Sequence, residues 1–182
     1  MTLQDLVMPL DRILKREGIA YAIIGAYAVA AWGEVRATRD IDLLCDEADL
    51  DRLKAALAKA KLVHEHRTGD AQDPVKDVVR IQISLDGTLY EIDVLFGIRS
   101  APPRIVDRSR VVELEGLSLK VASPEDLIIL KLLAGSARDF EDALSIMRIQ
   151  KHRIDRTLLQ DLCPDSIAVA LRRLMDLAAG SS

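Results

Sequence analysis

The sequence predicts an α+β fold, a mixed β-sheet with helices packed on it and a helical C-terminal third. Two observations lead to this class. The first half alternates helix, strand, helix, strand and helix and then continues into two hairpins, unlike the strict strand–helix repeat of a doubly wound sheet. From residue 123 to residue 177 the apolar spacing is helical almost throughout. A chain of 182 residues is long enough to bury one core without a disulfide or metal staple.

The N-terminal elements follow from apolar spacing. Residues 3–17 carry apolar side chains at helical intervals and are followed by Gly18, a plausible helix stop. Residues 21–24 form a short apolar run that predicts a buried strand, and the small residues at 26–32 predict a helix directly after it. A second strand is expected at 40–45 and a helix with one apolar stripe at 49–60.

Two hairpins are predicted in the middle of the chain. Residues 64–77 are polar and contain Gly69 and Pro74, so we expect an exposed loop there. Strands at 78–85 and 88–96 flank Asp86-Gly87, a dipeptide that favours tight hairpins. Strands at 111–114 and 117–121 are expected to form a second hairpin.

The C-terminal third is predicted to be helical. Ser123 suits a helix N-cap, and Pro124 suits the first helical position. Helices are expected at 127–134, 139–150, 155–162 and 167–177. We therefore expect residues 1–122 to form a core and residues 123–182 a helical extension packed on it, in a single compact unit.

Composition excludes several classes of protein. Lys and Arg number 25 against 29 Asp and Glu, a net charge of −4, which argues against binding nucleic acid through bulk positive charge. Two distant cysteines, Cys45 and Cys163, do not make a disulfide framework. The longest apolar stretch, 19–32, is too short to cross a bilayer, so no membrane partner is expected. The opening residues lack a secretory leader pattern, and a cytoplasmic location is the expectation.

Asp40 and Asp42 are the first candidate site residues. Side chains alternate along a strand, so both carboxylates point to the same face and repel each other unless a cation lies between them. Oxygen ligands of this kind suit Mg²⁺ or Mn²⁺. The alternative is that Asp40 is a solvated residue at the start of a strand.

Asp93 is a third acid within an apolar strand. Burial of a carboxylate among Ile92, Val94 and Leu95 is costly without a partner or a metal ion. If this strand neighbours the one that carries Asp42, three acids can form one metal site. The alternatives are an edge-strand acid facing water, or Glu91 in the role of third ligand.

The turn at Gly25 and Ala26 is the third candidate feature. A strand that runs through a glycine into a helix N-terminus directs free backbone N–H groups at one spot, and this spot suits a phosphate. The alternative is that a tight strand–helix turn needs glycine for conformational reasons alone.

Taken together, these motifs resemble the nucleotidyltransferase superfamily with the DNA polymerase β-like fold, and within it the minimal bacterial branch of AbiEii-type toxins. The matching segments are 24–33, 36–42 and 131–142, and the resemblance spans about residues 20 to 148. Gly25 and Ala26 match the glycine turn, Asp40 and Asp42 the metal pair, and Asp93 the third acid. Arg36, Thr38 and Lys131 match motif positions around the nucleotide.

The resemblance implies a metal-dependent transfer of NMP from an NTP to a hydroxyl acceptor on an RNA end such as tRNA, a protein or a small molecule. Asp40, Asp42 and Asp93 would hold Mg²⁺ or Mn²⁺, while Gly25, Ala26, Arg36, Thr38 and Lys131 would bind the nucleotide. It also implies a toxin–antitoxin partner.

Two departures from the family pattern keep alternatives open. Ala26 replaces the usual second Gly or Ser, and Ser136 stands where the branch often has Arg. A non-catalytic nucleotide-binding or antitoxin-like protein that retains the fold is the main alternative, and a plain interaction module is the third. Arg104, Arg108, Arg110 and Lys120 either line an acceptor groove or form a solvated face.

Overall fold

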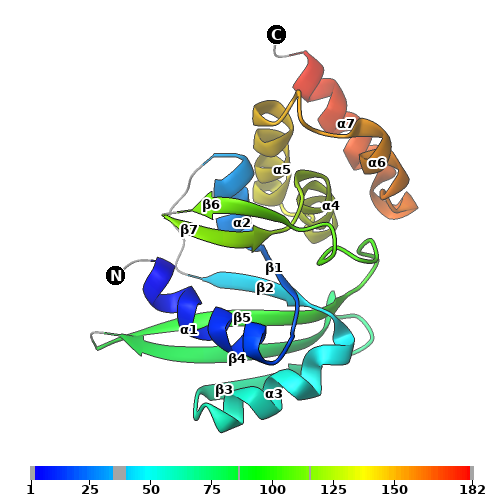
Figure 1. Cartoon of the computed structure of the whole chain (residues 1–182). Coiled ribbons are helices and arrows are strands. Elements are labelled where there is room, and N and C mark those ends of the chain that lie inside the picture. Colours follow the sequence, from blue (N-terminus) through cyan, green and yellow to red (C-terminus); the bar gives the residue numbers. More distant parts are fainter. Residues whose placement is uncertain (1–2, 35–39, 86, 115, 181–182) are drawn as a thin grey trace.

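The computed structural model describes residues 3–34, 40–85, 87–114 and 116–180, and its centre is a seven-stranded mixed sheet (Figure 1). The strands lie in the order β3-β4-β5-β2-β1-β7-β6. Their bounds are β1 Tyr21–Ile24, β2 Ile41–Cys45, β3 Val63–Thr68, β4 Val75–Leu85, β5 Thr88–Ile98, β6 Arg110–Leu114 and β7 Leu117–Val121. The predicted α+β class with a mixed sheet is confirmed.

Both parallel and antiparallel pairs build the sheet. β2 runs parallel to β5 and antiparallel to β1, while β1 runs parallel to β7. The predicted hairpins β4–β5 and β6–β7 are antiparallel neighbours, as expected. Because β2 lies between β1 and β5, three strands that are distant in sequence meet at the middle of the sheet.

The prediction of an exposed loop over residues 64–77 was wrong. Residues of β3 pair with β4, which itself begins at Val75, so only 69–74 connect the two strands. β3 is an edge strand with alternating exposure: His64 and His66 are half-buried, while Val63, Glu65 and Arg67 are exposed. Its outward residues are mostly polar, and this removed the apolar signal by which strands are recognised.

One face of the sheet is covered by α1 (Leu3–Arg16) and α3 (Leu50–Lys59), which lie on the same side in Figure 1. The alternating side chains of the strands on this face are apolar and fully buried. They include Ile23, Leu43, Ile81, Val94 and Phe96. Period-two alternation in the strands and helical spacing in α1 therefore build one continuous core.

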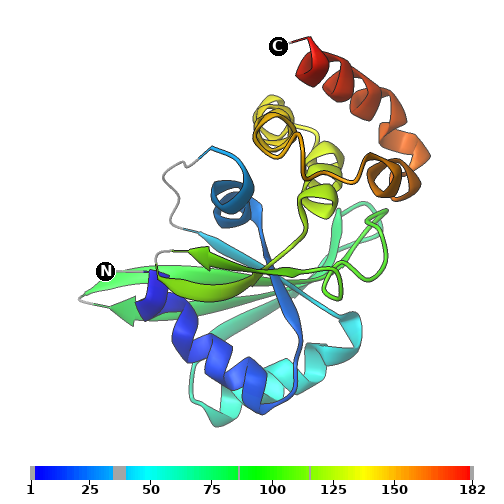
Figure 2. The same ribbon diagram turned by 45° about the horizontal axis from the view of Figure 1, so that its top comes forward.

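The opposite face is covered only in part. α2 (Gly25–Trp32) lies over β1 and β2, and the first two C-terminal helices pack against α2 on the same side of the sheet, as Figure 2 shows. The outward residues of β3, β4 and β5 remain accessible, among them Glu65, Arg80 and Leu89. Asp42 and Asp93 lie on this face, at the border between its covered and open parts.

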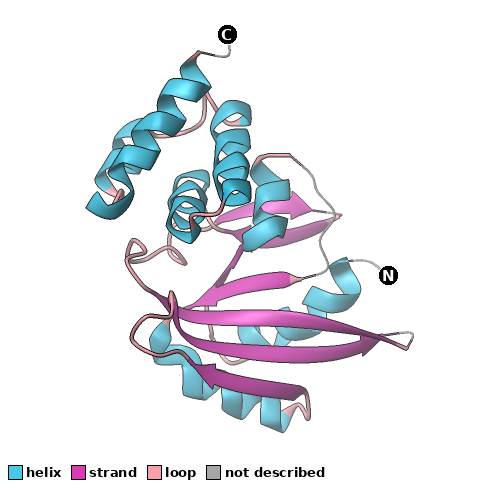
Figure 3. Ribbon diagram, turned by 180° about the vertical axis from the view of Figure 1, so that it is seen from behind, coloured by secondary structure: helices cyan, strands magenta, loops and turns pink. Residues whose placement is uncertain are grey.

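The C-terminal third is helical, as predicted, and its helices group together on the α2 side of the sheet in Figure 3. It contains α4 Pro124–Ala134, α5 Ala137–Ile149, α6 Arg156–Asp161 and α7 Ala168–Ala179. The division of the chain into residues 1–122 and 123–182 stays a prediction. No helix within the described ranges is long and apolar enough to cross a membrane.

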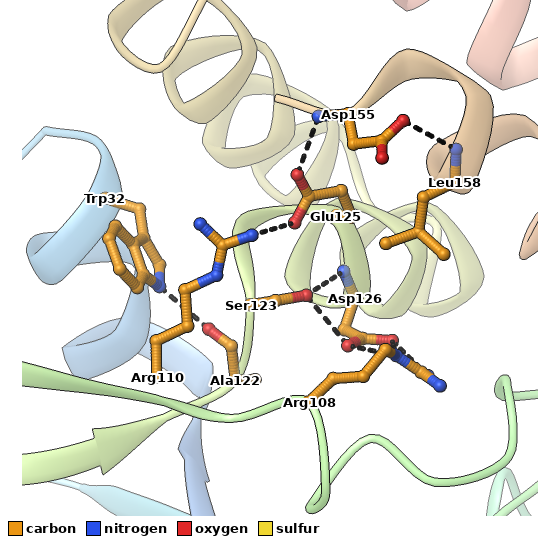
Figure 4. Close-up of polar contacts among 9 residues, drawn as sticks. All are labelled: Trp32, Arg108, Arg110, Ala122, Ser123, Glu125, Asp126, Asp155 and Leu158. Carbon is orange, nitrogen blue, oxygen red and sulfur yellow. Dashed lines mark hydrogen bonds and ion pairs between the residues drawn. The ribbon is translucent and has the colours of Figure 1, made fainter. Parts of the chain in front are cut away.

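Polar groups fix the start of α4 against the core (Figure 4). Ser123 caps the helix by accepting a hydrogen bond from the Asp126 N–H. The fully buried carboxylates of Glu125 and Asp126 pair with Arg110 and Arg108, respectively. Glu125 also accepts from the Asp155 N–H at the start of α6 (2.9 Å). Both acids at the predicted helix opening thus have partners in other segments.

Candidate active site

Asp42 and Asp93 lie side by side on neighbouring strands. In the parallel pair of β2 and β5 they stand directly opposite each other. Opposite residues of adjacent strands share a face and lie about 5 Å apart at the backbone. Glu91 is two residues earlier along β5, so Asp93 rather than Glu91 is the acid in register with Asp42. The sheet order thus brings two of the predicted acids together.

Gly25 lies against the Asp42 carboxylate. In the antiparallel pair of β1 and β2, Asp42 stands opposite Ile24, the last residue of β1. Gly25 adopts a φ of +65°, and a Cβ placed on it would lie only 2.0 Å from Asp42 Oδ2. Two independent constraints, the left-handed backbone and the close approach of the carboxylate, therefore require glycine at this turn.

The N-terminus of α2 begins at the same point. The N-cap residue is Ile24, whose apolar side chain makes no capping hydrogen bond to the helix. The first N–H groups of a helix have no partner within the helix and carry its positive partial charge. Ala26 is the second residue of α2 and is buried, and its methyl group does not replace the backbone amide. This turn can accept an anion beside Asp42.

Asp42 is the electrostatic centre of the site. Burial, then the negative charges of Asp93 and Asp40, raises the pKa of Asp42 from 3.8 to about 6, although Lys131 and Arg80 oppose this shift. Asp40 itself is exposed and immediately precedes β2. The three predicted acids are therefore close enough to influence one another, and the burial and mutual repulsion that raise this pKa favour binding of a cation.

Asp93 is held by a cation of the protein itself. Arg80 on β4 donates from Nε to Asp93 Oδ1 and from Nη2 to Asp93 Oδ2, each at 2.8 Å. Within residues 3–34, 40–85, 87–114 and 116–180, no three His, Cys, Asp or Glu side chains are arranged to hold a metal ion. Arg80 was not among the predicted site residues. Only its position opposite Asp93 in the β4–β5 ladder identifies it.

Lys131 reaches the site from α4. Its side chain is largely buried, and Nζ lies 2.9 Å from Asp139 Oδ1 and 2.8 Å from Asp142 Oδ2. The Lys131 ammonium thus pairs with two carboxylates of α5. Ser136 forms a capping box with Asp139 at the start of α5. The serine that departs from the family pattern therefore orders the carboxylate that holds Lys131.

A cavity of ≈ 560 Å³ opens beside these groups. Gly25, Asp42, Lys131 and Asp139 form its polar end. The remaining walls come from β4, β5, α4 and the segments 72–74 and 99–100. Most of their side chains are apolar, with Leu95, Ile98, Leu127, Leu130 and Leu133 among them, but Arg99 also lines the cavity. A cavity with a few polar groups and largely apolar walls suits a small ligand that has both a polar and an apolar part.

Two other sets of predicted residues have different outcomes. Arg36 and Thr38 lie outside the described residues. Arg104, Arg108 and Arg110 form ion pairs with Asp107, Asp126 and Glu125. Two of these pairs involve fully buried acids and fix the start of α4. An acceptor groove at these arginines and Lys120 stays a prediction. Trp32, half-buried, donates from Nε1 to the Ala122 carbonyl (2.8 Å) and joins α2 to the end of β7 (Figure 4).

Comparison with known proteins points to one class. A family model described as the nucleotidyl transferase AbiEii toxin of type IV toxin–antitoxin systems matches residues 12–177. Among curated proteins, no sequence relative matches significantly.

Several solved structures share the fold at low sequence identity. An antigenic nucleotidyltransferase-like protein from Paracoccidioides brasiliensis is 20% identical, with a TM-score of 0.56, over 96% of this chain and 92% of that one. The antibiotic-resistance factor ANT(2'')-Ia is 13% identical, with a TM-score of 0.56, over 97% and 94% of the two chains. The lincosamide antibiotic adenylyltransferase LnuA is 16% identical, with a TM-score of 0.50, over 82% and 98%.

Proposed function

Since the chain belongs to the AbiEii family of nucleotidyl transferase toxins, we propose that it moves a nucleoside monophosphate from an NTP to a hydroxyl acceptor in a metal-dependent reaction. The observation that carries this proposal is the register of Asp42 with Asp93, with Gly25 placed against the Asp42 carboxylate. Acids and an anion-binding turn on one sheet face are what phosphoryl transfer needs, because positioning and charge neutralisation dominate its catalysis.

The acids suit Mg²⁺ or Mn²⁺ by their chemistry. All three proposed ligands, Asp40, Asp42 and Asp93, offer hard carboxylate oxygens. The pKa of Asp42 is raised first by burial and then by the negative charges of Asp93 and Asp40, and a bound cation would offset this repulsion. When bound, the ion neutralises phosphate oxygens and lowers the pKa of the acceptor hydroxyl. The ligand set stays a proposal, as do the nucleotide-binding roles of Gly25, Ala26, Arg36, Thr38 and Lys131.

The chain's own groups divide the remaining work. Backbone amides at Gly25 and Ala26 would donate to the triphosphate, and Lys131 would place its positive charge beside the same oxygens. The acceptor oxygen forms a bond to the α-phosphorus while the bond from this phosphorus to the bridging oxygen of pyrophosphate breaks. A carboxylate oxygen of Asp93 would take the proton that the acceptor hydroxyl loses.

We leave the acceptor as a hydroxyl on an RNA end, a protein or a small molecule. The relatives of known structure illustrate the last class: ANT(2'')-Ia has been crystallised with adenylyl-2''-tobramycin and LnuA with lincomycin. A toxin–antitoxin partner and a cytoplasmic location, where NTPs are available, belong to the same proposal.

The direct test is transfer of label from each α-³²P-labelled NTP, in Mg²⁺ and cell extract, with Asp42→Asn as the key variant. We expect labelled product with the native chain and none with Asp42→Asn, at unchanged circular dichroism. Asp51→Asn is the control, because Asp51 is a fully exposed carboxylate on α3, beyond the opposite face of the sheet. Label transferred equally by Asp42→Asn would refute the site, and NTP-induced stabilisation without any product would support the non-catalytic alternative.

A further inference from the structure

Arg80 forms a bidentate ion pair with Asp93, the third acid of the proposed metal site. It stands opposite Asp93 in the antiparallel ladder of β4 and β5. Its guanidinium donates to both carboxylate oxygens at 2.8 Å, and Nη1 also lies 3.5 Å from Glu91 Oε2. A planar fork on a carboxylate is the strongest geometry that an arginine pair can adopt. One protein cation thus occupies both oxygens that a metal ion would use.

The surroundings allow this pair to open. Arg80 is 47% exposed and Asp93 is 23% exposed at the side chain. Both line a groove of ≈ 260 Å³ on the open sheet face, together with Glu65, Arg67 and Val78. Because nearly half of the Arg80 side chain is already exposed, its guanidinium can turn into solvent and hydrogen-bond to water once another cation neutralises Asp93. The fully buried Asp126, which also pairs with an arginine, has no such freedom.

The charge of Arg80 also acts on Asp42, on the neighbouring strand β2. Burial is the main cause of the raised pKa of Asp42; the negative charge of Asp93 raises this pKa further, while the positive charges of Lys131 and then Arg80 lower it. Arg80 therefore offsets part of the repulsion between the two acids in the metal-free protein. Once a divalent cation provides that neutralisation, the guanidinium is in excess.

We propose that Arg80 is a positioning residue that holds Asp93 as a counter-ion in the metal-free protein and leaves the carboxylate when a divalent cation binds. This inference rests on the proposed function, since it takes Asp42 and Asp93 as metal ligands. It adds a competition between guanidinium and metal that sets how tightly the free enzyme holds the ion.

The test measures Mn²⁺ binding alone, by the loss of the free-ion electron paramagnetic resonance signal, without nucleotide or turnover. Arg80→Gln removes the competing cation, and we expect the Mn²⁺ Kd to fall roughly fivefold. Arg80→Lys keeps the charge without the planar fork and should return the Kd toward the native value. Arg67→Gln is the matched control: it makes the same charge change in the same groove, but Arg67 stands opposite Val78 in the ladder.

Two results would overturn the role of Arg80. The first is a Mn²⁺ Kd that Arg80→Gln leaves unchanged. The second is an equal fall in this Kd with Arg67→Gln, which would mean that only the net charge of the groove matters. Asp42→Asn separates this failure from failure of the proposed function. If Asp42→Asn weakens Mn²⁺ binding while Arg80→Gln does not tighten it, only the role of Arg80 is wrong. If Asp42→Asn leaves Mn²⁺ binding unchanged, the metal site itself is wrong.

Discussion

Replacing Gly25 with alanine would disturb the candidate site without removing any charged group. The added Cβ would lie 2.0 Å from Asp42 Oδ2 and 2.9 Å from Asp42 Cγ. Contacts under 3.0 Å essentially do not occur for a real Cβ, so the carboxylate would have to move by about 1 Å or β1 would have to shift. Misplacement by 1 Å at a reacting centre can reduce a rate by about a hundredfold.

Backbone strain adds a separate cost. An alanine at a φ of +65° lies in the left-handed region, where a non-glycine residue is destabilised by about 1–2 kcal/mol. For a chain of this length, each kcal/mol lowers Tm by about 2–4 °C. Gly87→Ala is the matched control, because Gly87 has a φ of +76° and open space at its Cβ position. It carries the strain without the contact.

The assay is label transfer from an NTP in Mg²⁺, measured beside thermal melting. Both variants should lose a few degrees of Tm, whereas only Gly25→Ala should lose about a hundredfold in transfer rate. Native transfer by Gly25→Ala, or equal losses of activity in both variants, would refute the idea that Gly25 exists to let Asp42 approach.

Further predictions concern charge. The raised pKa of Asp42, about 6, means that the folded protein holds this proton more tightly than the unfolded chain; its stabilising effect is complete below about pH 4 and is lost as pH rises through 6. Metal-free Asp42→Asn should therefore exceed the native chain in stability by up to about 3 kcal/mol above pH 7, a gap that melting curves should show closing toward pH 4. Asp126→Asn removes the fully buried charge partner of Arg108 and should lower the free energy of unfolding in urea by about 3 kcal/mol. Asp107→Asn is the control: its ion pair with Arg104 is exposed, so its loss should lower this free energy by less than about 0.5 kcal/mol. Lys131→Met leaves two α5 carboxylates without their shared cation and should reduce both the Tm and the further rise in Tm that an NTP produces; an unchanged NTP response would remove Lys131 from the nucleotide site.

The fold was predictable wherever apolar spacing was regular. Helices α1 and α3 and the strands around Asp86-Gly87 each bury one side, and that pattern is visible in the sequence. β3 was missed because it is an edge strand with polar outward residues. An edge strand makes its backbone hydrogen bonds to one neighbour only, and its identity is decided by pairing with β4 rather than by its own composition.

The acids of the candidate site could be singled out from the sequence, but their arrangement could not. Asp42 and Asp93 could each be placed on a strand. The order β5-β2-β1, however, includes a parallel pairing between segments about 50 residues apart, which local patterns do not specify. The family resemblance implied that Asp42 and Asp93 meet. Arg80 was not predicted as a site residue because an outward arginine on a strand ordinarily faces water. Only the register of β4 against β5 reveals its carboxylate partner.

The most direct test of the proposed site is a crystal structure with Mn²⁺ and a non-hydrolysable NTP analogue, read from the anomalous signal of manganese. We expect a manganese peak about 2.1 Å from carboxylate oxygens of Asp42 and Asp93, with phosphate oxygens against the Gly25 turn. The proposed site would be contradicted by a manganese ion bound elsewhere, with Asp93 still paired with Arg80 and the triphosphate away from Gly25.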